Sequence, residues 1–248
     1  MISTKVGRAL VPTPERAHES DGHGFQVPAT HRREWDFTRD GILRSLEQSL
    51  DRLGLDRVDI VYLHDPDHHG EQAMTEGVDT LVELREQGVV RAIGAGMNQT
   101  EMLTEFVRRC DIDVIMLANR YTLLEQGALD ELLPLAHERG VGVVAAAVYN
   151  SGLLSRAVVP SDANFDYLPA PGELIAAARA IAAICERHGV TLPDAAVQYP
   201  LRHPAVVSVV LGTRTAEQAR EGARRASTPI PEELWRDLAA AGYLRGES

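Results

Sequence analysis

The fold is decided by Leu43-Arg-Ser-Leu46-Glu-Gln-Ser-Leu50-Asp-Arg-Leu53-Gly54-Leu-Asp-Arg-Val58-Asp-Ile-Val-Tyr-Leu63. Within it, four leucines are three or four residues apart and therefore line one face of a helix: Leu43, Leu46, Leu50 and Leu53. Gly54 is placed to cap that helix. A short apolar run, Val58–Leu63, follows at once. Because this run is continuous rather than alternating, we expect a strand buried on both faces, as in a parallel sheet covered by helices.

The same order of amphipathic stretch, glycine and apolar run recurs along the chain. Strands are predicted at 1–8, 58–63, 89–93, 114–117, 141–145 and 206–211, with a long helix near 172–188 and a shorter one near 193–202. Residues able to do chemistry follow nearly every strand: Lys5, His64, Asn98, Arg120, Asn150 and Arg214. That distribution predicts an α/β fold of the (β/α)8 TIM-barrel type, in which strand-end loops share one active site.

A closed barrel of this type has eight strands, and the pattern supplies about six strand–helix units. We therefore expect residues 1–248 to form a single incomplete barrel domain that lacks its N-terminal units. A loop over 9–37 and an irregular stretch over 154–171 account for the ordinary length.

Composition limits the partners and the compartment. The net charge is −11, from 25 basic and 36 acidic residues, and no block of like charge occurs, which argues against nucleic acid or a membrane surface as partner. No apolar run is long enough to span a bilayer. Cys110 and Cys185 make no disulfide framework, so a cytoplasmic location is expected.

Several motifs, each at a predicted strand end, resemble one family. They are Ser3-Thr-Lys-Val-Gly-Arg8, Ser45–Pro66, Gly94-Ala-Gly-Met-Asn-Gln99, Arg120-Tyr-Thr-Leu-Leu124, Asn150-Ser-Gly-Leu-Leu154 and Gly212-Thr-Arg214. Together they resemble the aldo-keto reductases, above all the branch that oxidises L-fucose and other aldoses, or pyridoxal, to lactones.

The resemblance implies a catalytic arrangement. In that family a tyrosine exchanges a proton with the substrate oxygen, a lysine paired with an aspartate lowers the tyrosine's pKa, and a histidine hydrogen-bonds the reacting oxygen. Lys5 matches the lysine and His64 the histidine. No residue matches the tyrosine or the aspartate, and Tyr62 is expected to point into a packing layer. The acidic and histidine-rich loop after His64 lacks regular ligand spacing, so no metal site is expected.

The resemblance also implies NAD or NADP as cofactor, and the sequence leaves the choice open. The cofactor-binding candidates are Asn98, Asn150, Ser151, Gly152, Leu153, Gly212, Thr213, Arg214 and Gln218. A helix N-terminus beside an arginine suits a phosphate, and Thr215 can equally be a simple N-cap. Gly222 stands where the family often has an adenine-contacting asparagine. Trp35 and Phe37 are candidate substrate walls or ordinary loop aromatics.

Three readings follow. The first is an NAD(P)-dependent oxidoreductase acting on a sugar-like aldose, from hemiacetal to lactone or by carbonyl reduction, with activity impaired in this chain. The second is a catalytically inactive barrel that binds a ligand or partner, since open strand edges favour pairing into a homo-oligomer. The third is a protein whose start lies upstream of Met1.

Overall fold

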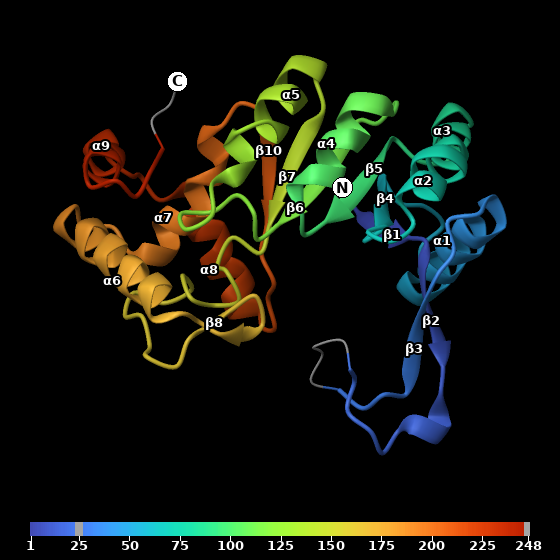
Figure 1. Ribbon diagram of the computed structural model, residues 1–248, viewed down its shortest axis with the longest axis horizontal. Coiled ribbons are helices and arrows are strands. Elements are labelled where there is room, and N and C mark those ends of the chain that lie inside the picture. Colours follow the sequence, from blue (N-terminus) through green and yellow to red (C-terminus); the bar gives the residue numbers. More distant parts are fainter. Residues whose placement is uncertain (23–26, 246–248) are drawn as a thin grey trace. The chain divides into compact units, whose positions relative to one another are not determined.

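The computed structural model describes residues 1–22 and 27–245, and six strands in them form one sheet (Figure 1). The order is β1-β4-β5-β6-β7-β10, and the pairs β1–β4, β4–β5 and β7–β10 are parallel. The strands are β1 (Ser3–Val6), β4 (Ile60–His64), β5 (Ala92–Met97), β6 (Val114–Ala118), β7 (Gly142–Ala146) and β10 (Val206–Val210). The predicted α/β fold of barrel type with about six strand–helix units is confirmed.

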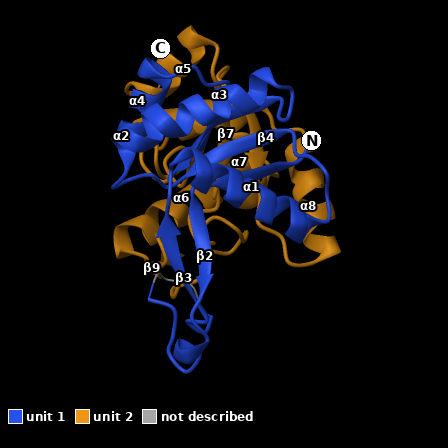
Figure 2. Cartoon of the chain, turned by 90° about the vertical axis from the view of Figure 1, so that its right-hand side faces the viewer, with its two compact units in different colours: residues 1–97, 101–116 blue, residues 98–100, 117–248 orange. Residues whose placement is uncertain are grey.

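The chain divides into two compact units (Figure 2). The first unit holds residues 1–97 and 101–116, and the second holds 98–100 and 117–248. Helices of the first are α1 (Arg39–Leu53), α2 (Gly70–Gln72), α3 (Val78–Glu86) and nearly all of α4 (Thr100–Arg109), and a π-helical turn (Ala73–Gly77) joins α2 to α3. Helices of the second are α5 (Leu132–Arg139), α6 (Gly172–Arg187), α7 (Leu192–Gln198), α8 (Ala216–Ser227) and α9 (Glu232–Ala240). That residues 1–248 form a single domain stays a prediction.

Helix α1 shows how the local sequence sets an element's ends. Thr38 caps its N-terminus by accepting a hydrogen bond at Oγ1 from Gly41 N at 3.1 Å, and Gly54 ends it in the left-handed region at φ 64°. The buried face carries Ile42 and Leu46 with small residues between them, whereas Leu53 is half exposed. The helix and its cap were predicted correctly, and the expected leucine stripe was wrong at its last member.

Strand β5 begins and ends later than its apolar run indicated. The apolar run itself covers 89–93, and Asn98 was expected to follow the strand; β5 continues through Gly94 to Met97, directly before Asn98. A Cβ on Gly94 would lie 1.6 Å from the carbonyl oxygen of Val114. The glycine is therefore required for close approach of the backbones and does not break the strand.

The predicted loop over 9–37 contains regular structure. An antiparallel hairpin pairs β2 (Arg8–Pro12) with β3 (His31–Trp35), and a 3-10 turn (Pro14–Arg16) follows β2. Arg33 of β3 forms an ion pair with Asp21 at 2.6 Å, and both side chains are nearly buried. This ion pair fixes the segment that connects the two strands of the hairpin. Residues 23–26 of this loop lie outside the described residues. The stretch 154–171, expected to be irregular, also contains a short hairpin, β8 (Asn164–Phe165) and β9 (Leu168–Pro169).

The remaining helical turns are short and lie in the second unit. They are 3-10 turns at Gly127–Leu129 and Pro200–Arg202. Across the described ranges, none of the helices combines the length and apolar character needed to cross a membrane.

Candidate active site

Lys5 and His64 lie on neighbouring strands of the first unit. In the parallel pair β1–β4, Lys5 is level with Tyr62, and His64 ends β4 two residues further on. His64 is in turn level with Gly96 of β5. The Cε of Lys5 lies 3.4 Å from the place that a Cβ on Gly96 would occupy. The structure therefore brings together the two predicted catalytic residues. Lys5 is also the only lysine in the sequence.

Burial and charge set the protonation of this pair. Burial lowers the pKa of Lys5, the carboxylate of Asp65 opposes that change, and the Arg8 charge adds to it. Burial, and then the charges of Lys5 and Arg8, lower the pKa of His64 to about 3. At neutral pH the imidazole is thus uncharged, with one N–H to donate and one nitrogen to accept.

Asp65 links this pair to the hairpin. It has left-handed backbone geometry at φ 46°, and its N–H donates to Gly96 O at 3.1 Å. Its carboxylate accepts a hydrogen bond from Arg8 Nη1 at 2.5 Å and lies 3.4 Å from His64 Nε2. Burial raises the pKa of Asp65, and the Arg8 charge opposes that rise. Sequence reasoning assigned no role to Arg8 or Asp65, although both belong to quoted motifs.

The two candidate substrate walls differ in accessibility. Trp35 donates from Nε1 to Asp65 O at 3.0 Å, and the Arg8 guanidinium lies 5.1 Å from its ring centroid. Its ring is part-exposed and stacks with His69 at 6.3 Å. Phe37 is fully buried, and a Cβ on Gly7 would lie 2.3 Å from its Cε1. Phe37 is therefore packed against the backbone of Gly7, and Trp35 is the accessible member of the pair.

Tyr62 keeps its proton. It is almost fully buried, and burial raises its pKa to about 12. Such a side chain is a poor proton donor or acceptor at neutral pH, which agrees with the prediction that Tyr62 points into a packing layer. Within residues 1–22 and 27–245, no His, Cys, Asp and Glu side chains cluster closely enough to hold a metal ion.

The loop after β7, in the second unit, carries four of the predicted cofactor residues. Asn150, Ser151 and Gly152 all have positive φ, at 45°, 57° and 98°. Asn150 is fully buried and donates from Nδ2 to the backbone oxygen of Asn119 at 3.4 Å. Ser151 Oγ accepts a hydrogen bond from Tyr167 N at 3.1 Å, and the neighbouring Leu153 is fully buried.

Two buried acceptors in this region have no donor. Neither Asn119 Oδ1 nor Asn150 Oδ1 has a hydrogen-bond partner within the described parts of the chain. A buried amide oxygen without a donor is costly, so such groups usually face a ligand or a water. The hydroxyl and amide N–H groups of a nicotinamide dinucleotide are suitable donors, and the residues present therefore fit this cofactor.

The loop after β10 is exposed. Gly212, Thr213 and Arg214 all face solvent, and Arg214 N donates to Gln218 Oε1 at 2.7 Å. Thr215 Oγ1 accepts from Gln218 N at 3.2 Å, so its N-cap role is confirmed.

Two other positions bear on the cofactor. Asn98 is exposed directly after β5. Gly222 is buried, and a Cβ there would lie 2.9 Å from Leu211 Cδ1. Neighbouring atoms would have to shift before Gly222 could be replaced by a larger residue such as the asparagine expected from the resemblance.

The comparison with known protein families agrees with this arrangement. The profile described as "Aldo/keto reductase family" matches residues 1–242. The chain belongs to the aldo/keto reductase family. It is 46% identical over 247 residues to D-threo-aldose 1-dehydrogenase from Pseudomonas sp, covering 98% of this chain and 75% of that protein. It is 36% identical over 254 residues to pyridoxal 4-dehydrogenase from Microbacterium luteolum, covering 98% and 73%.

Solved aldo-keto reductases share the fold. A holo-form aldo-keto reductase from Bacillus halodurans superposes with a TM-score of 0.68 at 23% identity, over 96% of this chain and 72% of that one. The glycerol dehydrogenase from Gluconobacter oxydans superposes with a TM-score of 0.75 at 20% identity, over 99% and 73%. As an aldo-keto reductase, the chain is an oxidoreductase that uses a nicotinamide nucleotide, and the predicted family is confirmed.

Proposed function

We propose that this aldo-keto reductase acts on a sugar-like aldose, either by oxidising the hemiacetal to a lactone or by reducing the carbonyl. The names of its relatives, D-threo-aldose 1-dehydrogenase and pyridoxal 4-dehydrogenase, support that substrate class. The observation that carries the proposal is the Lys5–His64 pair on adjacent strands, with an uncharged imidazole beside an ammonium group.

The pair suits the charge that develops in this chemistry. Carbonyl reduction builds negative charge on the substrate oxygen, and lactone formation begins from an oxygen that loses its proton. The neutral His64 N–H donates a hydrogen bond to that oxygen. Lys5 supplies a positive field beside it, and Trp35 forms an apolar wall. Asp65, held by Arg8, acts as a positioning residue for both.

A bound nicotinamide cofactor would supply the hydride chemistry, and residues of the second unit would hold it. In this proposal Asn98 binds the carboxamide, and Asn150, Ser151, Gly152 and Leu153 line the pyrophosphate. Gly212, Thr213, Arg214 and Gln218 bind the adenosine end. The glycine of this loop supports the assignment, because Gly152 has a positive φ of 98° and permits close approach of its backbone to the pyrophosphate. Both NAD and NADP are compatible with an exposed Arg214.

Turnover by this chain should be slow. Proton exchange with the substrate oxygen requires a group whose pKa permits it, and no residue here matches the family's tyrosine. Tyr62, with its pKa raised to about 12, does not supply that function.

The test is an absorbance assay for reduced nicotinamide with an aldose panel and either oxidised cofactor. We expect a low rate that drops further in Lys5→Met and in His64→Gln. Arg187→Gln, which changes an exposed arginine of α6, should leave the rate unchanged. Equal rates in all four proteins would overturn the proposal, and vigorous turnover by the unaltered chain would overturn the predicted impairment.

A homo-oligomer is also part of the proposal, and it would serve the alternative function of a non-catalytic binding barrel. β10 is an end strand of the sheet, and its Val207 and Val210 are 63% and 44% exposed. Exposed apolar edge strands favour pairing with another chain. Light scattering should give a mass above 27.1 kDa, the mass of one chain, and a stable monomer would contradict this.

We further propose a cytoplasmic location, because Cys110 and Cys185 are both unpaired.

A further inference from the structure

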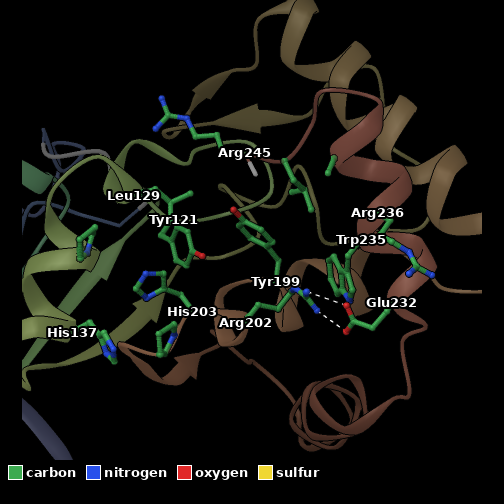
Figure 3. Close-up of a pocket in the computed structure, with 14 residues that line it drawn as sticks. Tyr121, Leu129, His137, Tyr199, Arg202, His203, Glu232, Trp235, Arg236 and Arg245 are labelled. Atoms are coloured by element: carbon green, nitrogen blue, oxygen red, sulfur yellow. Dashed lines mark hydrogen bonds and ion pairs between the residues drawn. The ribbon is translucent and has the colours of Figure 1, made fainter. Parts of the chain in front are cut away.

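The second unit contains a cavity of about 830 Å³ that none of the proposed site residues lines (Figure 3). Its walls come from α5, α9, the 3-10 turn Pro200–Arg202 and the segment that follows β6. Pockets that hold small ligands have volumes of roughly 300–1,000 Å³, so the cavity is of a suitable size for one.

One wall of this cavity is a set of packed aromatic rings. Tyr121 and Tyr199 lie 5.2 Å apart between centroids, and Trp235 is 6.4 Å from Tyr199. The His203 ring meets Tyr121 edge-on at 6.2 Å. The side chains of Tyr121, Tyr199 and Trp235 are each at most 6% exposed, so the wall is fixed in place before any ligand arrives. A preformed aromatic wall favours a flat ring.

The lining is rich in positive charge although the chain carries −11 overall. Three arginines line the cavity, against one carboxylate, Glu232. Arg202 neutralises that carboxylate through two hydrogen bonds of 2.8 and 3.1 Å while its guanidinium lies 5.0 Å from the Trp235 ring centroid. The lining therefore has no uncompensated negative charge.

The other two arginines lie further out, on either side of the aromatic rings (Figure 3). Arg236 pairs with Glu233 and Arg245 with Asp130. A guanidinium has five N–H donors, so each can hold a further anion alongside its present partner.

We propose that this cavity binds a small flat aromatic molecule that carries a carboxylate. The ring packs against Tyr199 and Trp235, and the carboxylate turns toward Arg236 or Arg245. This binding is separate from the proposed oxidoreduction, because the cavity shares no residue with the catalytic pair or with the proposed cofactor residues.

Calorimetric titration with matched probes tests the proposal. Indole-3-acetate has both features, indole-3-acetamide lacks the charge, and cyclohexanecarboxylate lacks the aromatic ring. We expect indole-3-acetate to bind at least tenfold more tightly than either of the others. Changing Arg236 and Arg245 together to Gln should weaken indole-3-acetate binding by about tenfold, as expected for loss of a charged hydrogen bond. Arg187→Gln should not change it.

Three results of this probe titration would overturn the proposal. They are absence of binding, equal affinity for all three probes, and affinity that the double arginine variant leaves unchanged. Both altered arginines are largely exposed, at 70% and 53% for Arg236 and Arg245, so the variant is expected to fold. A further titration in the presence of saturating NAD and NADP should give the same affinity. Displacement by either would place the ligand in the cofactor site and contradict a separate cavity.

Discussion

His64 should make a measurable contribution to the pH dependence of folding. Burial and two nearby positive charges lower its pKa from 6.5 to about 3. Between those values the unfolded chain binds a proton that the folded chain does not. The associated stability is therefore fully present above pH 6.5 and is lost progressively as the pH falls toward 3.

The size of this contribution follows from the two pKa values. At pH 5 the unfolded imidazole is almost fully protonated and the folded one almost fully neutral, so the folded state of the chain loses about 2 kcal/mol relative to pH 7.5. The His64→Gln variant lacks this contribution and retains the other histidines, whose effects cancel in the comparison.

The assay is urea denaturation of both proteins at pH 7.5 and pH 5, followed by circular dichroism. The unaltered chain should lose about 2 kcal/mol more than His64→Gln over this interval. Lys5→Met should reduce that excess loss, because removing the lysine charge raises the pKa of His64. Identical losses in the unaltered chain and His64→Gln would refute the reasoning.

Other predictions concern backbone approach, the site's carboxylate and a helix cap. Gly94→Ala should abolish cooperative thermal unfolding, because its Cβ would lie 1.6 Å from a β6 carbonyl oxygen, whereas Gly127→Ala, with nothing within 4 Å, should melt near the original temperature. Asp65→Asn should lower the pKa of Lys5 further, since this carboxylate raises it, and an NMR titration of the ¹³C-methylated lysine would show an unchanged midpoint if that is wrong. Thr191→Ala removes the capping box of α7 and should cost about 1 kcal/mol in urea denaturation.

The sequence predicted those parts of the fold in which local pattern and tertiary packing agree. Helix α6 was expected near 172–188 and spans Gly172–Arg187, because its alanine-rich pattern ends at a glycine. Strand β5 begins later than the apolar run at 89–93 and continues through Gly94 and Gly96. Gly94 is needed only because the carbonyl oxygen of Val114 in β6 lies against it. That requirement depends on long-range contacts, which local pattern does not contain.

The candidate site divides in the same way. The proximity of Lys5 and His64 could be predicted because both lie near the carboxyl ends of recognisable strands, whereas their catalytic roles come from the family resemblance and stay a prediction. The role of Asp65 could not be predicted, since it depends on a left-handed turn at Asp65 and on a hydrogen bond from Arg8, a contact between residues far apart in the sequence. The unpartnered oxygens of Asn119 and Asn150 are likewise a property of the packed second unit. Trp35 and Phe37 were equal candidates from the sequence, and only the structure shows that Phe37 is fully buried whereas Trp35 is part-exposed.

The central claim is that Lys5 of the first unit belongs to an oxidoreductase site that works with a nicotinamide cofactor. Because Lys5 is the only lysine in the chain, ¹³C-methylation gives it a single side-chain NMR signal. Titration with NAD and with NADP should shift that signal saturably for at least one of them, and Arg187→Gln should leave the response unchanged. A Lys5 signal that stays unmoved by an excess of both cofactors would contradict the account.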